Sequence, residues 1–366
     1  MGSNKNEDRV IDGSAWRAFC EELKTAGDAI LREGNPEDAF NRAEGFRYLS
    51  RLTRAALEAH VEFGDPRYPG FYQLSNETIK IGNDNPDNCY LNSTISGRYD
   101  YRISGQRGTV PYLSIGTKAG GYETSGTMVP TGHIDAKDMK IEPDGRFELI
   151  VSCQPKPGNW LGMKPETTQL IVRQTFADRA SEEPADLTIE CLNVDEPNVL
   201  DPSALEAKLH SAAHFVQNTS NIFIDWMQRY SKHINELPSD DQQMCQNAGG
   251  DASIHYFQSY WRLADDEALV IRPQRIPNCA AWNFQLSNYW MESLDYRDHK
   301  VWINNHTASY DEQGNVTIVV AHEDPGPAYP NWVETTQHRE GGMLFRWIDA
   351  EDHPPIDTEV VRFSDL

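Results

Sequence analysis

The chain has 366 residues, of which 33 are Lys or Arg and 56 are Asp or Glu, and its formal net charge is −23. A surface this acidic repels nucleic-acid phosphates and anionic lipid headgroups, so we expect neither a nucleic acid nor a membrane as a partner. The sequence has no apolar run of about 18 residues and no secretion signal at its start, which makes the cytoplasm the expected location. Its 6 scattered cysteines include no CxxC pair, which predicts free thiols and excludes a zinc ribbon.

Composition divides the chain into helical and β parts. Early apolar residues recur at a spacing of three to four, and Asn35-Pro36 supplies a capping side chain and a proline suited to the first turn of a helix. Asp201-Pro202 is a similar start for a long helix that runs to about residue 235. The predicted parts are an N-terminal helical segment (1–63), a first β unit (64–200), a bridging helix with its linker (201–246) and a second β unit (247–366).

Short β-branched and aromatic runs between turn residues mark the strands. In the first β unit the candidate strands are 79–82, 99–103, 111–117, 147–153, 170–176 and 187–192. In the second unit, 301–306 and 316–322 are predicted to pair as a hairpin through the turn at 311–314.

The two β units repeat one pattern. DGRFELIVSCQPKPGNWL (144–161) and QGNVTIVVAHEDPGPAYPNWV (313–333) each run from a turn through a strand to Asn-Trp. Each copy then returns through a strand containing an arginine, LIVRQTF (170–176) and MLFRWI (343–348). We therefore predict an α+β fold that is mainly β, with two duplicated antiparallel jelly-roll-like units, a long bridging helix and a cleft between the units.

Three segments of the chain resemble a known family: HEDPGPAYPNWVETTQHREGGMLFRW (322–347), GNDNPDNCYLNSTISGRYDYRISG (82–105) and NRAEGFRYLSRLTRA (41–55). They resemble an uncharacterised bacterial family catalogued as domain of unknown function 1214, over roughly residues 37–350. The resemblance implies a mainly β, viral-jelly-roll-like fold with a helical addition. It supplies no reaction, so function has to be argued from the residues themselves.

The repeat helps to select catalytic candidates. Positions shared by both copies, such as the Asn-Trp pairs, more often serve the fold, with Asn in a turn and Trp plugging the sandwich. The copies diverge where Cys153-Gln154-Pro155 of the first corresponds to His322-Glu323-Asp324 of the second. A histidine and carboxylates at a strand end could act as acid and base, although a solvated loop start is the alternative. The candidate catalytic residues are His322, Glu323, Asp324 and His338, whose loop returns toward the same sheet.

A polar run, Asn83 to Asn88, precedes the strand that holds Tyr90. Asn and Asp at this density form successive turns, or they bind ligand hydroxyls while nearby aromatic rings stack on a ring face. The candidate substrate-binding residues are Tyr72, Asn85, Asp87, Asn88, Tyr90, Trp290, His306, Trp332 and Arg339.

No motif predicts a metal or a cofactor. His210 and His214 share a helix face, but their H-x-x-x-H spacing lacks the glutamate of a metalloprotease, and a hydrogen-bonded pair is the favoured interpretation. A P-loop, a G-x-G-x-x-G turn and a G-x-S-x-G elbow are all missing from the sequence.

The leading functional hypothesis is a cofactor-independent enzyme of the hydrolase or lyase type. It would apply His and carboxylate acid–base chemistry to a hydroxylated or aromatic small-molecule substrate in the cleft between the β units. The alternative is a non-catalytic ligand-binding or assembly module. A homo-oligomer is compatible with either hypothesis.

Overall fold

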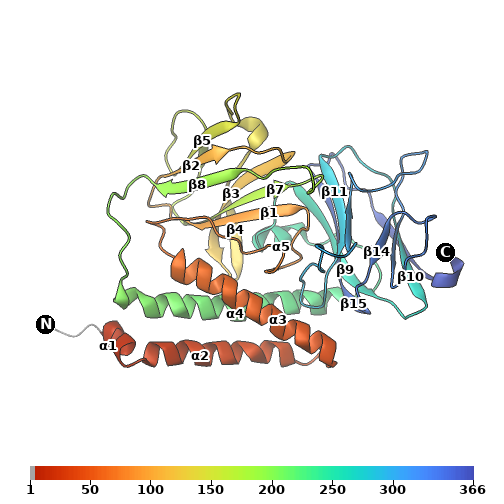
Figure 1. The fold of residues 1–366 in the computed structure, drawn as a ribbon, viewed down its shortest axis with the longest axis horizontal. Helices are drawn as coiled ribbons and strands as arrows, with labels where there is room; N and C mark the ends of the chain where they lie inside the picture. Colours follow the sequence, from red (N-terminus) through yellow and green to blue (C-terminus); the bar gives the residue numbers. More distant parts are fainter. Residues whose placement is uncertain (1–4) are drawn as a thin grey trace.

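The computed structural model describes residues 5–366, which form two β units side by side on a layer of helices (Figure 1). The helices of this layer are α1 (Lys5–Ile11), α2 (Ser14–Ala26), α3 (Ala39–Ala56) and α4 (Pro202–Tyr230). Shorter helical turns are η1 (Gly27–Leu31), η2 (Leu57–Glu62), η3 (Ala136–Asp138), α5 (Gln242–Asn247) and η4 (Phe363–Asp365). No helix in the described part of the chain is long and apolar enough to cross a membrane.

Carboxylate caps fix where two of the helices begin. The Asp201 side chain accepts a hydrogen bond from the Ser203 amide, and Pro202 occupies the first turn of α4, as predicted. Helix α3 begins later than the Asn35-Pro36 signal implied, because Asp38 is its cap. Asn35 is instead buried, and its side chain donates to the carbonyl oxygen of Ala29 at the end of the preceding turn.

Each β unit is a sandwich of two four-stranded sheets. The first unit has the orders β1-β7-β3-β4 and β6-β5-β2-β8, and the second has β9-β15-β11-β12 and β14-β13-β10-β16. In the first unit the strands are β1 (Asn88–Thr94), β2 (Tyr101–Gln106), β3 (Tyr112–Gly121), β4 (Thr127–Asp135), β5 (Arg146–Ser152), β6 (Trp160–Gly162), β7 (Thr167–Thr175) and β8 (Asp186–Cys191). In the second they are β9 (Ile254–Arg262), β10 (Glu267–Pro273), β11 (Ala281–Leu286), β12 (Trp302–Asn304), β13 (Ile318–Ala321), β14 (Trp332–Glu334), β15 (Glu340–Ile348) and β16 (Ile356–Arg362).

The two units have the same topology strand for strand, which confirms the predicted duplication. Strand β1 corresponds to β9, β7 to β15, β3 to β11 and β4 to β12, and the outer sheets correspond in the same way. Even the exception to antiparallel pairing is repeated, since β5 pairs with β6 and β13 with β14 in parallel. We call the sheets that contain β1 and β9 the inner sheets, because the faces that they turn away from their own sandwich cores meet at the junction of the units (Figure 1). The other sheet of each unit is its outer sheet.

Several predicted strands need correction. The hairpin through 311–314 is wrong, because β12 pairs with β11 in the inner sheet whereas β13 pairs with β10 and β14 in the outer sheet. The predicted strand 79–82 is part of the loop that leads into β1, where Ile79 forms only an isolated bridge with Asn76. The sequence prediction also missed β4, because Pro130 and Gly132 are unusual residues in a strand. The proline is tolerated here because β4 lies at the edge of its sheet.

The repeated Asn-Trp pair serves the fold, but not in the predicted way for Trp. The side-chain amides of Asn159 and Asn331 both donate to carbonyl oxygens of neighbouring segments, in equivalent positions. Trp160 and Trp332 are only half-buried. The sandwich cores are filled by the next residue in each copy, Leu161 and Val333.

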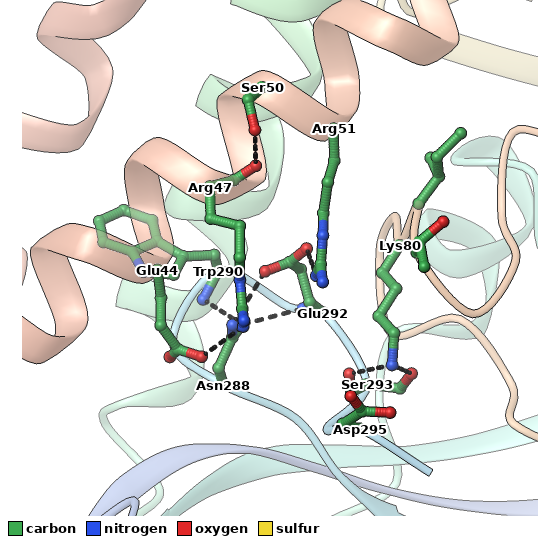
Figure 2. A network of polar contacts seen from close by, with 12 residues as sticks. Glu44, Arg47, Ser50, Arg51, Lys80, Asn288, Trp290, Glu292, Ser293 and Asp295 are labelled. Carbon is green, nitrogen blue, oxygen red and sulfur yellow. Dashed lines mark hydrogen bonds and ion pairs between the residues drawn. The ribbon is translucent and has the colours of Figure 1, made fainter. Parts of the chain in front are cut away.

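The helical layer is joined to the second unit by polar contacts between α3 and the loop 288–295 (Figure 2). Arg51 on α3 forms an ion pair of 2.6 Å with Glu292, whose side chain is 1% exposed. The ammonium group of Lys80 donates to the Ser293 carbonyl and hydroxyl oxygens at 2.6 and 2.9 Å. A buried charge needs such partners. The Arg51 ion pair therefore holds α3 against the second unit, and Lys80, in the loop before β1, links the first unit to the same loop 288–295.

Candidate functional site

A cavity of about 140 Å³ lies where the two inner sheets meet α4, and we call it the axial cavity. Strand alternation explains its lining. Along β7, Leu170 and Val172 point into the first sandwich, so Ile171 and Arg173, which alternate with them, point to the junction. Along β15, Phe345 and its alternating neighbours fill the second sandwich, and Arg346 points to the junction.

The polar lining is made of equivalent residues from the two units. Tyr90 of β1 lies opposite Arg173 of β7 in the strand register, and Tyr256 of β9 lies opposite Arg346 of β15. Both tyrosines and both arginines line the axial cavity. The duplicated arginine strand therefore brings a second Tyr–Arg pair to the same place.

The two units hold each other reciprocally at this point. The Arg346 guanidinium of the second unit donates to the carbonyl oxygen of Asn83, in the loop that leads into β1. The Arg173 guanidinium of the first unit donates to the carbonyl oxygen of Gly249, in the equivalent segment before β9. Reciprocal contacts of this kind are what a two-fold relation between like surfaces produces, so the axial cavity lies on a pseudo-two-fold axis.

The two arginines differ in electrostatic compensation. Arg173 has a counter-ion, since its Nη1 is 3.5 Å from Oδ2 of Asp251. Arg346 is 3% exposed, and within the described residues it has no carboxylate within ion-pair distance. Its guanidinium donates to neutral oxygens, at Asn283 Oδ1 and Gln285 Oε1 in addition to the Asn83 carbonyl. Burial lowers the pKa of Arg346, an effect that Asp84 and Asp87 oppose at longer range, and an arginine keeps its proton in a protein.

The tyrosine hydroxyls add two hydrogen-bond donors. Each accepts a backbone hydrogen bond of 3.1 Å, Tyr90 from the Asn85 amide and Tyr256 from the Asp251 amide. Among the described residues, no acceptor takes the proton of either hydroxyl. Burial raises the pKa of Tyr90 and of Tyr256, so both phenols stay protonated and can donate.

The lining also contains a buried carboxyl group, an unpartnered acceptor and an apolar wall. The carboxyl group is Asp84, whose pKa is raised by burial and whose oxygens accept hydrogen bonds from the amide and hydroxyl of Ser293. The side-chain oxygen of Asn83 is buried and has no partner in residues 5–366, while its amide nitrogen donates to Gln258 at 2.8 Å. The apolar side chains of the wall come from α4, both inner sheets and the loop before β1: Ile81, Tyr122, Met128, Ile171, Phe223, Trp226, Ile254 and Leu344. A dry cavity of about 150 Å³ can hold benzene, so the axial cavity suits a molecule of a similar size.

The comparisons with known proteins identify the family. A family model described as "Protein of unknown function (DUF1214)" matches residues 264–352. The crystal structure of an uncharacterised protein from Burkholderia cenocepacia is 50% identical, covers 98% of this chain and 100% of its own, and superposes with a TM-score of 0.95. This chain belongs to the DUF1214 family.

A crystal structure of the VPA0106 protein from Vibrio parahaemolyticus is more distant, at 11% identity and a TM-score of 0.48, with coverage of 92% of this chain and 100% of that one. No curated protein matches the sequence.

In this DUF1214 chain, the polar run before β1 forms a buried bridge between the units. Asp87 accepts hydrogen bonds from the side chains of Trp302 and Asn304 at 2.8 and 2.9 Å, and Asn85 accepts one from Asn283 at 2.6 Å. Of the predicted substrate-binding residues, three line the axial cavity: Asn85, Asn88 and Tyr90. Asp87 braces the bridge outside the lining.

The predicted catalytic group of this DUF1214 chain lies elsewhere. His322 follows β13 in the outer sheet, with Nδ1 2.8 Å from Thr335 Oγ1. His338 is buried and binds Glu44 of α3 through Nε2 at 2.9 Å. Glu323 and Asp324 are exposed, and none of these four residues lines the axial cavity.

The remaining predicted binding residues are dispersed over the structure. Tyr72 lines a separate open cavity of about 470 Å³ beside η2. Trp290 is buried under α3, with its indole nitrogen donating to the Asn41 carbonyl. The others lie outside the axial cavity: His306 is exposed, Arg339 is paired with Asp265 at the surface, and Trp332 packs on the outer sheet.

Lys118 of β3 adds a titratable group close to the axial cavity. Its ammonium group is 3.0 Å from the Gly250 carbonyl oxygen, and burial, assisted by the Arg173 charge, lowers the pKa of Lys118 from 10.5 to about 7. The unfolded chain therefore binds one more proton than the folded chain between about pH 7 and 10.5, and Lys118 makes stability rise with pH in this window.

We expect Lys118→Met to lose this contribution. The free energy of unfolding of the wild type minus that of the variant should increase from about pH 7 to about pH 10, in urea titrations at several pH values. Lys140→Met, at a lysine whose side chain is 82% exposed, is the control and should give a flat difference. A flat difference for Lys118→Met as well would contradict the assignment.

Proposed function

We propose that this protein binds a small organic carboxylate in the axial cavity. The observation that carries the proposal is Arg346, a buried guanidinium without a carboxylate partner, next to the free donor protons of Tyr90 and Tyr256. A buried cation is stable when it is paired, and a carboxylate accepts hydrogen bonds from a guanidinium and from hydroxyls alike.

The rest of the lining narrows the ligand class. A body the size of a benzene ring fits the volume of about 140 Å³, and the walls from Phe223 and Trp226 are suited to an aromatic or branched aliphatic body. The unpartnered oxygen of Asn83 is an acceptor for a ligand hydroxyl. A hydroxylated aromatic acid therefore complements Arg346, the two tyrosine hydroxyls, the Asn83 oxygen and the apolar wall.

This proposal follows the ligand-binding alternative of the sequence analysis. Acid–base catalysis of the hydrolase or lyase type stays a prediction. The catalytic hypothesis assigns this chemistry to His322 and the carboxylates beside it, which follow strand β13 of the outer sheet. The groups on which the proposal rests, the Arg346 guanidinium and the hydroxyls of Tyr90 and Tyr256, keep their protons, so they suit binding better than proton transfer.

We expect 4-hydroxybenzoate and benzoate to raise the melting temperature of the wild type, whereas the neutral isosteres benzamide and benzyl alcohol should not. The double variant Tyr90→Phe/Tyr256→Phe should bind these acids at least about tenfold more weakly in calorimetry, because it loses two hydrogen bonds to a charged group. Tyr310→Phe, at an exposed tyrosine, is the matched control.

Equal binding of acids and neutral isosteres would contradict the proposed charge recognition. The proposal of a ligand site would fail altogether if none of the four compounds shifted the melting temperature, since the axial cavity would then hold only water.

A further inference from the structure

A cluster of metal-ligating side chains lies on the opposite side of α4 from the axial cavity. His210 and His214 are four residues apart on α4, and their rings lie 3.9 Å apart between centroids. Glu22 of α2 faces them, with Oε1 2.9 Å from Nδ1 of His210. One ligand atom from each of these three residues lies within 4.8 Å of the other two.

A second observation concerns the Glu22 carboxylate. Its Oε1 is taken by His210, but its Oε2 is buried and has no hydrogen-bond partner in the described part of the chain. A buried carboxylate oxygen without a partner is costly, because it has lost its water and gained nothing in return. A cation held between Glu22 and the histidines would satisfy it.

We propose that Glu22, His210 and His214 bind one divalent transition-metal ion of the zinc class. Two imidazole nitrogens and a carboxylate oxygen are a ligand set that Zn²⁺ accepts, with a water in the fourth position. Imidazole also favours Ni²⁺ and Cu²⁺, whereas Mg²⁺ and Ca²⁺ prefer oxygen ligands alone. The spacing on α4 suits chelation, since residues four apart in a helix are neighbours on one face.

The sequence pattern gave half of this site. His210 and His214 form a pair on one helix face, but the local sequence indicates no third ligand. Glu22 supplies a carboxylate from 188 residues earlier in the chain, because α2 packs along α4 (Figure 1). The ion would therefore link two helices, and its binding would stabilise the attachment of the N-terminal α2 to the rest of the protein.

Calorimetric titration of the full chain with ZnCl₂ at neutral pH tests the site. We expect one saturable site per chain, with affinity at least about tenfold lower in His214→Ala and in Glu22→Gln. Zinc should also raise the melting temperature of the wild type and leave that of His214→Ala unchanged. Binding should weaken toward pH 5.5, because imidazoles must be neutral to ligate.

Two variants control for other histidines. His353→Ala breaks a second close pair, His255 and His353, whose rings are stacked at 3.9 Å, and His233→Ala removes a histidine that faces Glu236 alone. Neither should change zinc affinity. The proposal is overturned if His214→Ala binds zinc like the wild type, if His353→Ala loses the binding instead, or if the wild type shows no saturable site.

Discussion

Replacing Arg346 by methionine is expected to lower the free energy of unfolding by about 3 to 5 kcal/mol. The guanidinium is 3% exposed and donates to three acceptors, which are the carbonyl oxygen of Asn83 and the side-chain oxygens of Asn283 and Gln285. Methionine fills a similar volume but donates nothing. Each acceptor left buried without a partner costs about 1 to 3 kcal/mol, and these costs are not fully additive.

Urea denaturation of the wild type and the variant measures this loss. Arg275→Met is the matched control, because Arg275 pairs with Asp352 at the surface and its loss should cost under about 1 kcal/mol. If Arg346→Met were as stable as Arg275→Met, the bridge between the units would contribute far less than its contacts imply.

The second large effect is expected at the contact between α3 and the second unit. Arg51→Met should cost about 3 to 5 kcal/mol, because it removes the ion-pair partner of Glu292, whose side chain is 1% exposed. Burial already raises the pKa of Glu292, and Asn288 is the other side chain that supports its carboxylate. An unpaired carboxylate at this depth must either stay charged without its partner or take up a proton, and both reduce stability.

Two further variants distinguish the effect of losing the Arg51–Glu292 ion pair from the effect of losing any arginine on α3. Arg47 lies one turn earlier on α3, and its side chain is 54% exposed. Arg47→Met should therefore lower the free energy of unfolding by under about 1 kcal/mol. Adding Glu292→Gln to Arg51→Met removes the stranded charge and should restore part of the stability. A double variant no more stable than Arg51→Met would show that the cost comes from packing and not from charge.

The sequence predicted the duplication because the signals that carry it are short and local. An arginine inside an apolar strand and an Asn-Trp pair after a turn recur in both copies, and both follow from equivalent strand positions. The hairpin failed for the opposite reason, because strands adjacent in the chain belong to different sheets in a sandwich, and no local pattern encodes that crossing.

The axial cavity was only partly visible in the sequence. The comparison of the copies predicts that shared positions serve the fold and that divergent positions, such as His322, serve function. That rule does not hold on a pseudo-two-fold axis, where both copies contribute the same residue to one place, as Arg173 and Arg346 do. The available signal was the arginine itself, since a lone charge in the middle of a buried strand needs an explanation.

The reciprocal contacts across the junction have a consequence for how a ligand is oriented. Two identical units would offer a ligand two equivalent orientations, related by half a turn, with equal energy. Here the amide of Asn85 in the first unit corresponds to the carboxylate of Asp251 in the second. Asp251 pairs with Arg173, whereas Arg346 has no carboxylate within ion-pair distance among the described residues. Because both copies lie on one chain, such differences can accumulate, and an acid in the axial cavity would then have one preferred end for its charge.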